Sequence, residues 1–144
     1  MSLNNYLDFA ENDYNYFVNS YKRGDVANMM GAIAQGVCEK YLKHLINEFY
    51  LPQSDNEKIE KEQALRTHNI NRLLKYLDNH LNIVFSTQAI QYMRIIDGFY
   101  FTTRYPGEDS LEISIDDIED CYIAIKKCRS ETLYWINQLQ HEGN

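Results

Sequence analysis

The sequence predicts an all-α protein, organised as an up-and-down bundle of about five helices. Apolar residues recur every three or four positions in the hydrophobic stretches, and no stretch shows a convincing period of two. The 144 residues include only two prolines and six glycines, which suits long helices better than a turn-rich sandwich or barrel. Because 44% of the residues are hydrophobic, the chain can fill one core, and we expect a single domain over residues 1–144.

The first helix is predicted near the start of the chain, with Ser2 as its cap and Gly24 as the residue that ends it. Its apolar seam consists of Leu3, Leu7, Ala10, Tyr14, Phe17 and Tyr21. Asp25 is expected to cap a second helix at once, and so short a connection makes the two helices antiparallel neighbours. The second helix is predicted to run to about Tyr50 with a broad apolar face, which indicates contact with more than one neighbour.

Pro52 ends that second helix. The polar segment 51–63 (LPQSDNEKIEKEQ) is expected to be a mobile loop with at most one short helical turn. A third helix is predicted from Thr67, because apolar residues then follow at helical spacing as far as Leu81.

A fourth helix is predicted to begin at position 86 or 87 and to end at Tyr105, which the following proline forces out of helical geometry. The fifth and longest helix is predicted from a pair that resembles a capping box, Ser114 and Asp117. In a bundle of five alternating helices, the first, third and fifth run one way and the second and fourth the other.

The charge of the chain limits its partners. The formal net charge is −7, and the acidic residues gather between 108 and 120, where we expect a solvated loop and a helix start. Such a charge argues against indiscriminate binding to duplex DNA. No apolar run is long enough to cross a membrane and no signal peptide is apparent, so we expect a cytoplasmic protein. Cys38, Cys121 and Cys128 are predicted to be buried reduced thiols.

Alternating directions bring the end of the second helix, the start of the third and the end of the fourth to one pole of the bundle. His44, His68 and Arg104 are expected near this pole, with Lys43 about a turn deeper. His68 would lie in a first helical turn, where backbone N–H groups favour anions, and Arg104 would add a fork of donors. The sequence therefore predicts a small anion or phosphate site.

Structural roles for the same residues remain open. Arg104 could cap carbonyl groups at the end of its own helix, and His68 could bind a neighbouring segment. Glu39 and Lys43 have the spacing of an ordinary surface ion pair. The sequence has no glycine-rich phosphate loop, no HExxH, no CxxC and no histidine pair at i,i+4. It therefore assigns no catalytic residue, no metal site and no cofactor.

Three stretches of the chain then occur in a familiar order: AIAQGVCEKYLKHLI (32–46), RTHNINRLLKYL (66–77) and GFYFTTRYPG (98–107). Together they resemble the HEPN family, named for nucleotide-binding domains of higher eukaryotes and prokaryotes. In this type of domain a helix reading approximately AQqaaEKylKalL precedes a Thr-His-x-Leu helix start and a Tyr-x-x-x-Arg-Tyr-Pro ending. The matching positions are Glu39, Lys40, Lys43, Thr67, His68, Ile70, Tyr100, Arg104, Tyr105 and Pro106.

The resemblance implies a compact helical bundle that commonly forms a homodimer. Members are often encoded beside, or fused to, a minimal nucleotidyltransferase. Another branch consists of metal-independent ribonucleases, many of them toxins, marked by an arginine and a histidine with four to six residues between them. This sequence lacks that mark, since the nearest approach, Arg72 to His80, has seven residues between.

The sequence thus favours a non-catalytic HEPN-type domain that binds a nucleotide or other anion, a short RNA, or a nucleotidyltransferase-like partner. The ligand-contacting residues are predicted to be His68, Arg104, Lys43 and Tyr100. One alternative is a divergent, toxin-like ribonuclease that assembles its arginine and histidine from different helices or across a dimer. The other is a purely structural dimerisation module.

Overall fold

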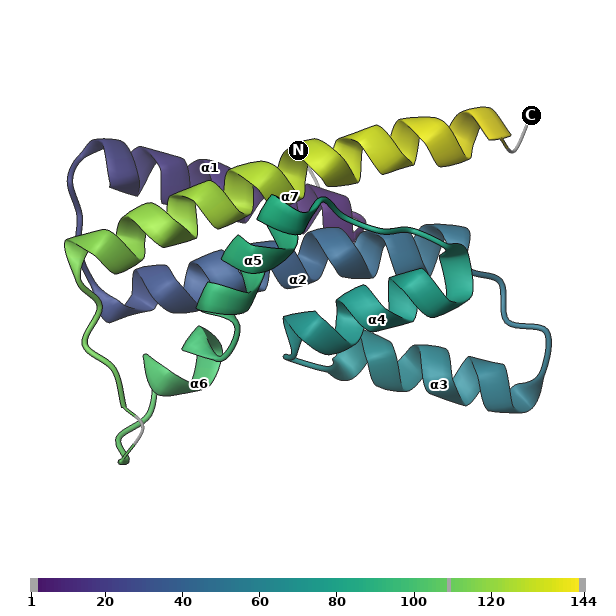
Figure 1. Ribbon diagram of the computed structural model, residues 1–144, viewed down its shortest axis with the longest axis horizontal. Helices are drawn as coiled ribbons and strands as arrows, with labels where there is room; N and C mark the ends of the chain where they lie inside the picture. Colours follow the sequence, from purple (N-terminus) through teal and green to yellow (C-terminus); the bar gives the residue numbers. More distant parts are fainter. Residues whose placement is uncertain (1–2, 109, 143–144) are drawn as a thin grey trace.

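The computed structural model describes residues 3–108 and 110–142, and within these it is all-α, as predicted, with no strand (Figure 1). The described residues form seven helices, more than the predicted number of about five. Their bounds are α1 Tyr6–Lys22, α2 Asn28–Phe49, α3 Asp55–Arg66, α4 Ile70–Leu81, α5 Thr87–Ile96, α6 Phe99–Thr102 and α7 Ile115–Glu142.

The first two helices are antiparallel, as predicted, but their caps differ from the prediction. Ser2 lies outside the described residues, and the side chain of Asn5 caps α1. Gly24 adopts a φ of 80° after the end of α1, as the prediction requires. Asp25 does not cap α2: it forms a 3.0 Å ion pair with Arg23, and α2 begins three residues later, after Ala27.

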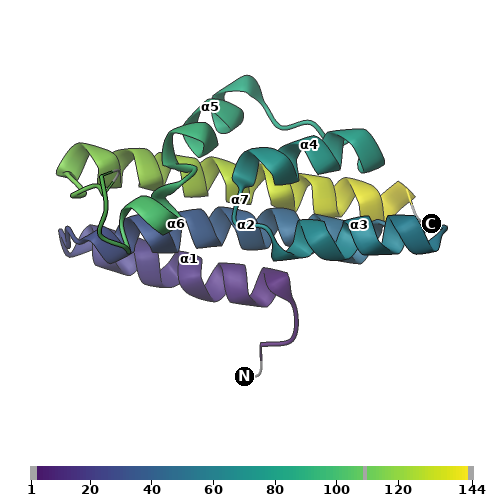
Figure 2. The same ribbon diagram turned by 90° about the horizontal axis from the view of Figure 1, so that it is seen from below.

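The central element of the bundle is α2, which contacts every other helix. Figure 2 shows α1 on one side of α2 and α5 on the other. Every residue from Tyr41 to Ile46 is buried, so the helix is covered on all sides at this level. Near its start, a Cβ atom at Gly31 would lie 3.0 Å from Ile113 and 3.1 Å from Thr103, so only glycine lets these segments approach closely.

The prediction of a mobile loop over 51–63 is wrong, because most of this segment belongs to α3. Ser54 caps the helix by accepting a hydrogen bond from the Glu57 N–H. Only Ala64 of α3 is buried, so the helix has almost no apolar seam for the sequence to reveal. Lys61 anchors it to the bundle by donating to the carbonyl groups of Asn47 and Tyr50.

Because α3 was not predicted, α7 runs in the direction opposite to the predicted one. Tyr21 binds Glu119, and Glu11 binds Arg129, so α7 runs antiparallel to α1. The sequence predicts that the first and last helices run the same way. Since α3 adds one reversal to the chain, α7 instead runs parallel to α2, and the two lie side by side (Figures 1 and 2).

The bounds of α4 and α5 also differ from the prediction. The predicted start of the third helix at Thr67 is wrong, because α4 begins at Ile70 behind the cap Asn69. The helix α5 begins at Thr87, one of the two predicted positions, and Ser86 caps it. However, this helix ends at Ile96 rather than Tyr105.

The early end of α5 has a local cause. Gly98 takes a φ of 99°, which breaks the helix and starts the short α6. The predicted Ser114–Asp117 capping box forms in full at the start of α7.

All three cysteines are buried and none is in a disulfide, as the sequence predicts. Cys38 and Cys128 lie on the facing sides of α2 and α7, where the Cys128 thiol is 3.9 Å from the Cys38 carbonyl oxygen. Burial raises the pKa of the Cys121 thiol to about 12, so this group is a packing residue rather than a nucleophile. Among the described residues, no helix is both long and apolar enough to span a bilayer.

Candidate functional site

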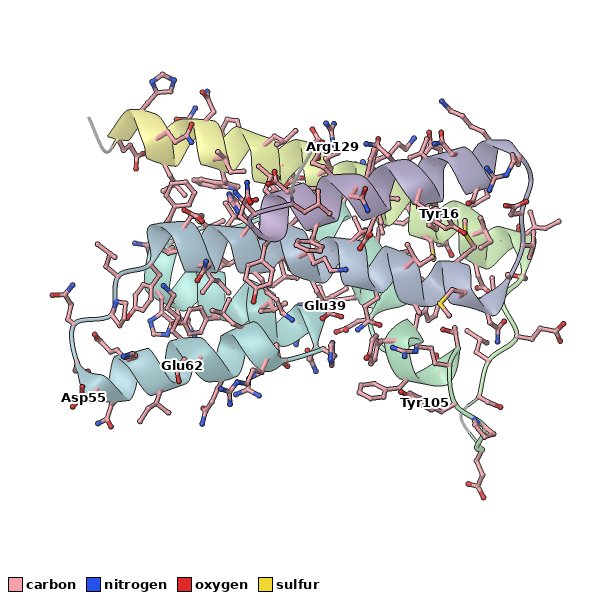
Figure 3. The ribbon with its side chains drawn as sticks, turned by 180° about the vertical axis from the view of Figure 1, so that it is seen from behind. Tyr16, Glu39, Asp55, Glu62, Tyr105 and Arg129 are labelled. Carbon is pink, nitrogen blue, oxygen red and sulfur yellow. The ribbon has the colours of Figure 1, made fainter. Side chains whose placement is uncertain are left out.

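A pocket of about 310 Å³ lies on one side of α2, bounded by α1, by the α3–α4 connection, and by α6 with the residues after it. The four residues predicted to contact a ligand all line this pocket: Lys43, His68, Tyr100 and Arg104. Figure 3 shows Glu39, which also lines it, on the middle of α2, with Tyr16 on the neighbouring α1. Four separate parts of the chain therefore meet at one site.

The pocket lies along the middle of α2, so the prediction that these residues meet at a pole of the bundle is wrong. The chain folds back through α3, and the α3–α4 connection then meets α2 near Glu39 rather than at its end. His44, which the sequence places at the same pole, does not line the pocket. It is buried beside Phe49 instead.

Glu39 is the centre of the polar contacts. Its Oε1 atom lies 2.9 Å from Nδ1 of His68 and 3.4 Å from Nζ of Lys43. The expected surface pair of Glu39 and Lys43 is in fact buried, with side chains only 3% and 8% exposed. A buried ion pair is costly unless its members have further partners, and here His68 supplies one.

The contact with Glu39 fixes the orientation of the His68 ring. Because an ionised carboxylate only accepts hydrogen bonds, the Nδ1–H group of His68 is the donor and Oε1 of Glu39 is the acceptor. The structure gives Nε2 no hydrogen-bond partner among the residues it describes. The side chain is 42% exposed and lines the pocket.

Tyr100 holds both of the other side chains. The His68 ring stacks on the Tyr100 ring, with centroids 4.1 Å apart and planes within 10° of each other. The Arg104 guanidinium lies 4.4 Å from the same centroid, a cation–π contact. Among the described residues Arg104 forms no ion pair and its side chain caps no carbonyl group, so its donors are available.

Sequence reasoning missed Gln35, a fully buried residue that lies one turn before Glu39 on α2. Its Nε2 donates to the His68 carbonyl oxygen over 2.7 Å, and its Oε1 accepts the Tyr100 N–H over 2.6 Å. One amide thus joins the two segments that carry the site. The available signal was a polar residue four positions before a glutamate within an otherwise apolar helical face.

One predicted component of the site is absent. His68 does not lie in a first helical turn, because it precedes the cap Asn69. The N–H groups at the start of α4 are already bound: the Asp97 carboxylate accepts those of Ile70 at 3.0 Å and Asn71 at 3.1 Å. These two N–H groups are therefore not free to bind an anion, and the polar side chains of the pocket remain as donors.

The lining of the pocket divides into two halves along α2. Toward the start of α2 it is apolar, with Met29, Ala32 and Ile33. Toward the end of α2 it is charged, and there Lys40 also forms a 2.5 Å ion pair with Asp13 of α1. Within the described part of the chain, no group of three histidine, cysteine or acidic residues is placed to hold a metal ion.

Comparison with known proteins identifies one family. The family model of the HEPN domain matches residues 4–131, which is most of the chain and includes every residue of the pocket. No curated protein and no solved structure matches the chain.

Proposed function

The chain belongs to the HEPN domain family, and from this premise we propose that it is a non-catalytic binding domain whose pocket holds a nucleotide or another small anion. One observation carries the proposal: Lys43, His68 and Arg104 converge on a single pocket in a chain whose net charge is −7. Within the described residues Lys43 is paired with Glu39 whereas no carboxylate pairs with Arg104, so the guanidinium supplies the charge that attracts and orients an anion.

Each side chain has a distinct role in this proposal. Arg104 provides a planar fork of N–H donors that suits phosphate oxygens, and its stacking on Tyr100 limits the freedom that it loses on binding. His68 donates through Nδ1 to Glu39, so its Nε2 can accept a hydrogen bond from a hydroxyl or amino group of the ligand. Lys43 supplies positive charge at short range from within the bundle.

A thermal-shift titration with ATP, GTP and short oligoribonucleotides tests the proposal. A ligand that binds only the folded chain stabilises it by about 2.7 kcal/mol at 100 times its Kd. We expect Arg104→Ala to remove most of the shift and the matched control Arg72→Ala, an exposed arginine outside the pocket, to leave it unchanged. No shift with any ligand, or the same shift after Arg104→Ala, would refute the assignment.

We also propose that the domain forms a homodimer and associates with a nucleotidyltransferase-like protein, as the family resemblance implies. Exposed apolar side chains at the pocket support an interface in this region: Tyr16 and Met29 line it, and Phe101 packs edge-on against His68 and Tyr100. Sedimentation velocity tests the dimer. Co-purification with the product of a neighbouring nucleotidyltransferase reading frame tests the partner.

A second function, a divergent metal-independent ribonuclease, is favoured by one observation. His68 and Arg104 pack against the same Tyr100 ring, and His68 is oriented by a carboxylate, an arrangement that suits proton transfer near a phosphodiester. Incubation with total RNA and a chelator separates the two functions. Cleavage that disappears in His68→Ala supports the enzyme, whereas intact RNA supports the binding domain.

A further inference from the structure

A small groove between α4 and α5 is separate from the pocket on α2. Its volume is about 110 Å³, well below the roughly 300 Å³ at which small-molecule sites begin, so it suits a single side chain. Its apolar lining consists of Leu74 on α4, Ile90 on α5, and Val84 and Phe85 from the connection between the two helices. Phe85 is buried, whereas Val84 is 57% exposed, so the groove offers apolar surface to a partner.

The charged lining of the α4–α5 groove has more positive than negative groups. Lys75 follows Leu74 on α4, and Arg94 lies one turn after Ile90 on α5. Neither forms an ion pair with any residue that the structure describes. Among the described lining residues, Asp78 is the one acid. Two unpaired cations around an apolar floor favour an apolar side chain that is flanked by carboxylates.

The chain itself displays such a side chain at the start of α7. Ile115 is 67% exposed, although it is a large apolar residue. The segment 112–120 around it contains five acids and no base: Glu112, Asp116, Asp117, Glu119 and Asp120. Burial, followed by the charges of three of the other acids, raises the pKa of Asp120. The carboxylates therefore repel one another, and a cationic surface would relieve this repulsion.

The position of Ile115 is fixed from both sides. On one side, the Asn28 side chain donates to the Leu111 carbonyl oxygen over 2.7 Å and accepts from the Ile113 N–H over 2.8 Å. On the other side, the capping box holds the first turn of α7. A partner thus meets a side chain that is already in place, which lowers the entropy cost of binding. Figures 1 and 2 show the start of α7 at one end of the bundle and α4 toward the other, so Ile115 does not reach the groove of its own chain.

We propose that Ile115 of one copy inserts into the α4–α5 groove of a second copy. The carboxylates of Glu112 and Asp116 then lie against Lys75 and Arg94 of the second copy. Each copy carries one groove and one acidic segment, so the contact can form twice about a two-fold axis or repeat from copy to copy. The contact goes beyond the proposed function, since none of these residues lines the pocket on α2.

Sedimentation velocity of the full chain measures this contact. Because it buries little area and depends on charge, we choose a chain concentration of about 100 µM and low salt. We expect self-association that weakens as salt is added. Ile115→Ser should weaken it at least tenfold without lowering the melting temperature, because this side chain is exposed in the single chain. The matched control Ile59→Ser, at a 53% exposed position on α3, should leave the association unchanged.

An exchange of charges identifies the two surfaces. One chain carries Glu112→Lys with Asp116→Lys, and the other carries Lys75→Glu with Arg94→Glu. All four positions are exposed, so both chains should melt close to the parent. We expect each chain alone to associate at least tenfold more weakly than the parent, and an equimolar mixture to associate again, because the reversed charges are complementary. Asp78→Asn, which removes the one acid of the groove, should tighten the parent association severalfold.

Three results would overturn the inference: a parent chain that stays monomeric, equal association of Ile115→Ser and the parent, or charge-reversed chains that do not associate when mixed. Phe101→Ser tests the separate interface proposed beside the pocket, and it should leave the association of the mixed chains unchanged. Anion binding by the pocket on α2 should be the same in Ile115→Ser and the parent chain. The proposed anion site is therefore tested independently of this contact.

Discussion

Glu39 and His68 are joined by a 2.9 Å hydrogen bond although 29 positions separate them in the sequence. Glu39 belongs to the most buried helix of the bundle, whereas His68 belongs to a short connection on its surface. The contact therefore fixes the orientation of an exposed imidazole relative to the buried helix α2. A ligand that binds the imidazole meets a group whose orientation is already set, which lowers the entropy cost of binding.

The buried ion pair gives the first prediction. We expect Glu39→Ala to destabilise the fold by about 3–5 kcal/mol, because Lys43 then keeps a buried charge without a partner. The double variant Glu39→Leu with Lys43→Met should recover most of this loss, since apolar groups of similar volume replace a buried pair well. Urea unfolding at pH 7 measures both effects.

Glu62→Ala is the matched control for that experiment, because Glu62 is an exposed glutamate on α3. Its effect should stay within about 0.5 kcal/mol. A cost for Glu39→Ala no larger than for this control would mean that the pair does not contribute to stability. A double variant as unstable as the single one would show that His68 and the pocket, rather than Lys43, depend on the carboxylate.

Gln35 gives the second prediction. In Gln35→Met the side-chain volume is kept, but the His68 carbonyl and the Tyr100 N–H each lose a partner. An orphaned polar group costs about 1–3 kcal/mol when it is fully buried, and these two are only partly buried, so a total loss of about 1–3 kcal/mol is expected from urea unfolding. Hydrogen exchange gives a local measurement, because the Tyr100 amide should exchange faster in the variant.

Gln91→Met on the exposed face of α5 serves as the control for Gln35→Met. It should change neither the unfolding free energy nor the exchange of the Tyr100 amide. If that amide is equally protected in the parent chain and in Gln35→Met, then Gln35 does not join the two segments in solution.

The sequence was sufficient for features that depend on local pattern. Ser114 caps α7 as predicted, and α5 starts at one of the two predicted positions, because a helix start is determined largely by the cap side chain and the three residues after it. The four predicted ligand residues also meet in one pocket. Lys43 lies on α2 itself, and the segments of His68 and Tyr100 are both bound to α2 through Gln35.

Features that depend on tertiary contacts could not be predicted in this way. The helix α3 is polar and has no clear apolar pattern for the sequence to reveal. It is held to the bundle by Lys61, which binds carbonyl groups more than ten residues away. Because α3 was not predicted, the predicted direction of α7 and the predicted position of the pocket were both wrong. Asp97 and Gln35 bind backbone atoms of distant segments, and no spacing in the sequence identifies such partners.

His44 gives a prediction about pH. Burial lowers its pKa below the usual 6.5, although Glu48 and Asp8 act in the opposite direction. The unfolded chain therefore binds a proton at a higher pH than the folded chain, and stability falls as pH drops below about 6.5. We expect the urea midpoint of the parent chain to fall between pH 7 and pH 5.5, and to fall less in His44→Leu.

His141→Gln is the control for this pH effect, since His141 is exposed near the end of α7. It should show the same pH dependence as the parent chain. If His44→Leu loses as much stability between pH 7 and pH 5.5 as the parent chain does, the effect belongs to other groups.

The ion pair between α1 and α7 predicts sensitivity to acid. Burial raises the pKa of Glu11, but hydrogen bonds from Arg129 and Tyr41 and the charge of Arg129 outweigh it and bring the pKa below the usual 4.5. The folded chain thus releases this proton more readily than the unfolded chain, so the stability gained is present above pH 4.5 and is lost as the pH falls through the lowered value.

Urea unfolding at pH 5 and pH 3 should show a smaller loss of stability in Glu11→Gln than in the parent chain, with the control Glu62→Gln behaving like the parent. Equal losses in Glu11→Gln and the parent chain would show that the Glu11–Arg129 contact does not stabilise the packing of α1 on α7 in solution.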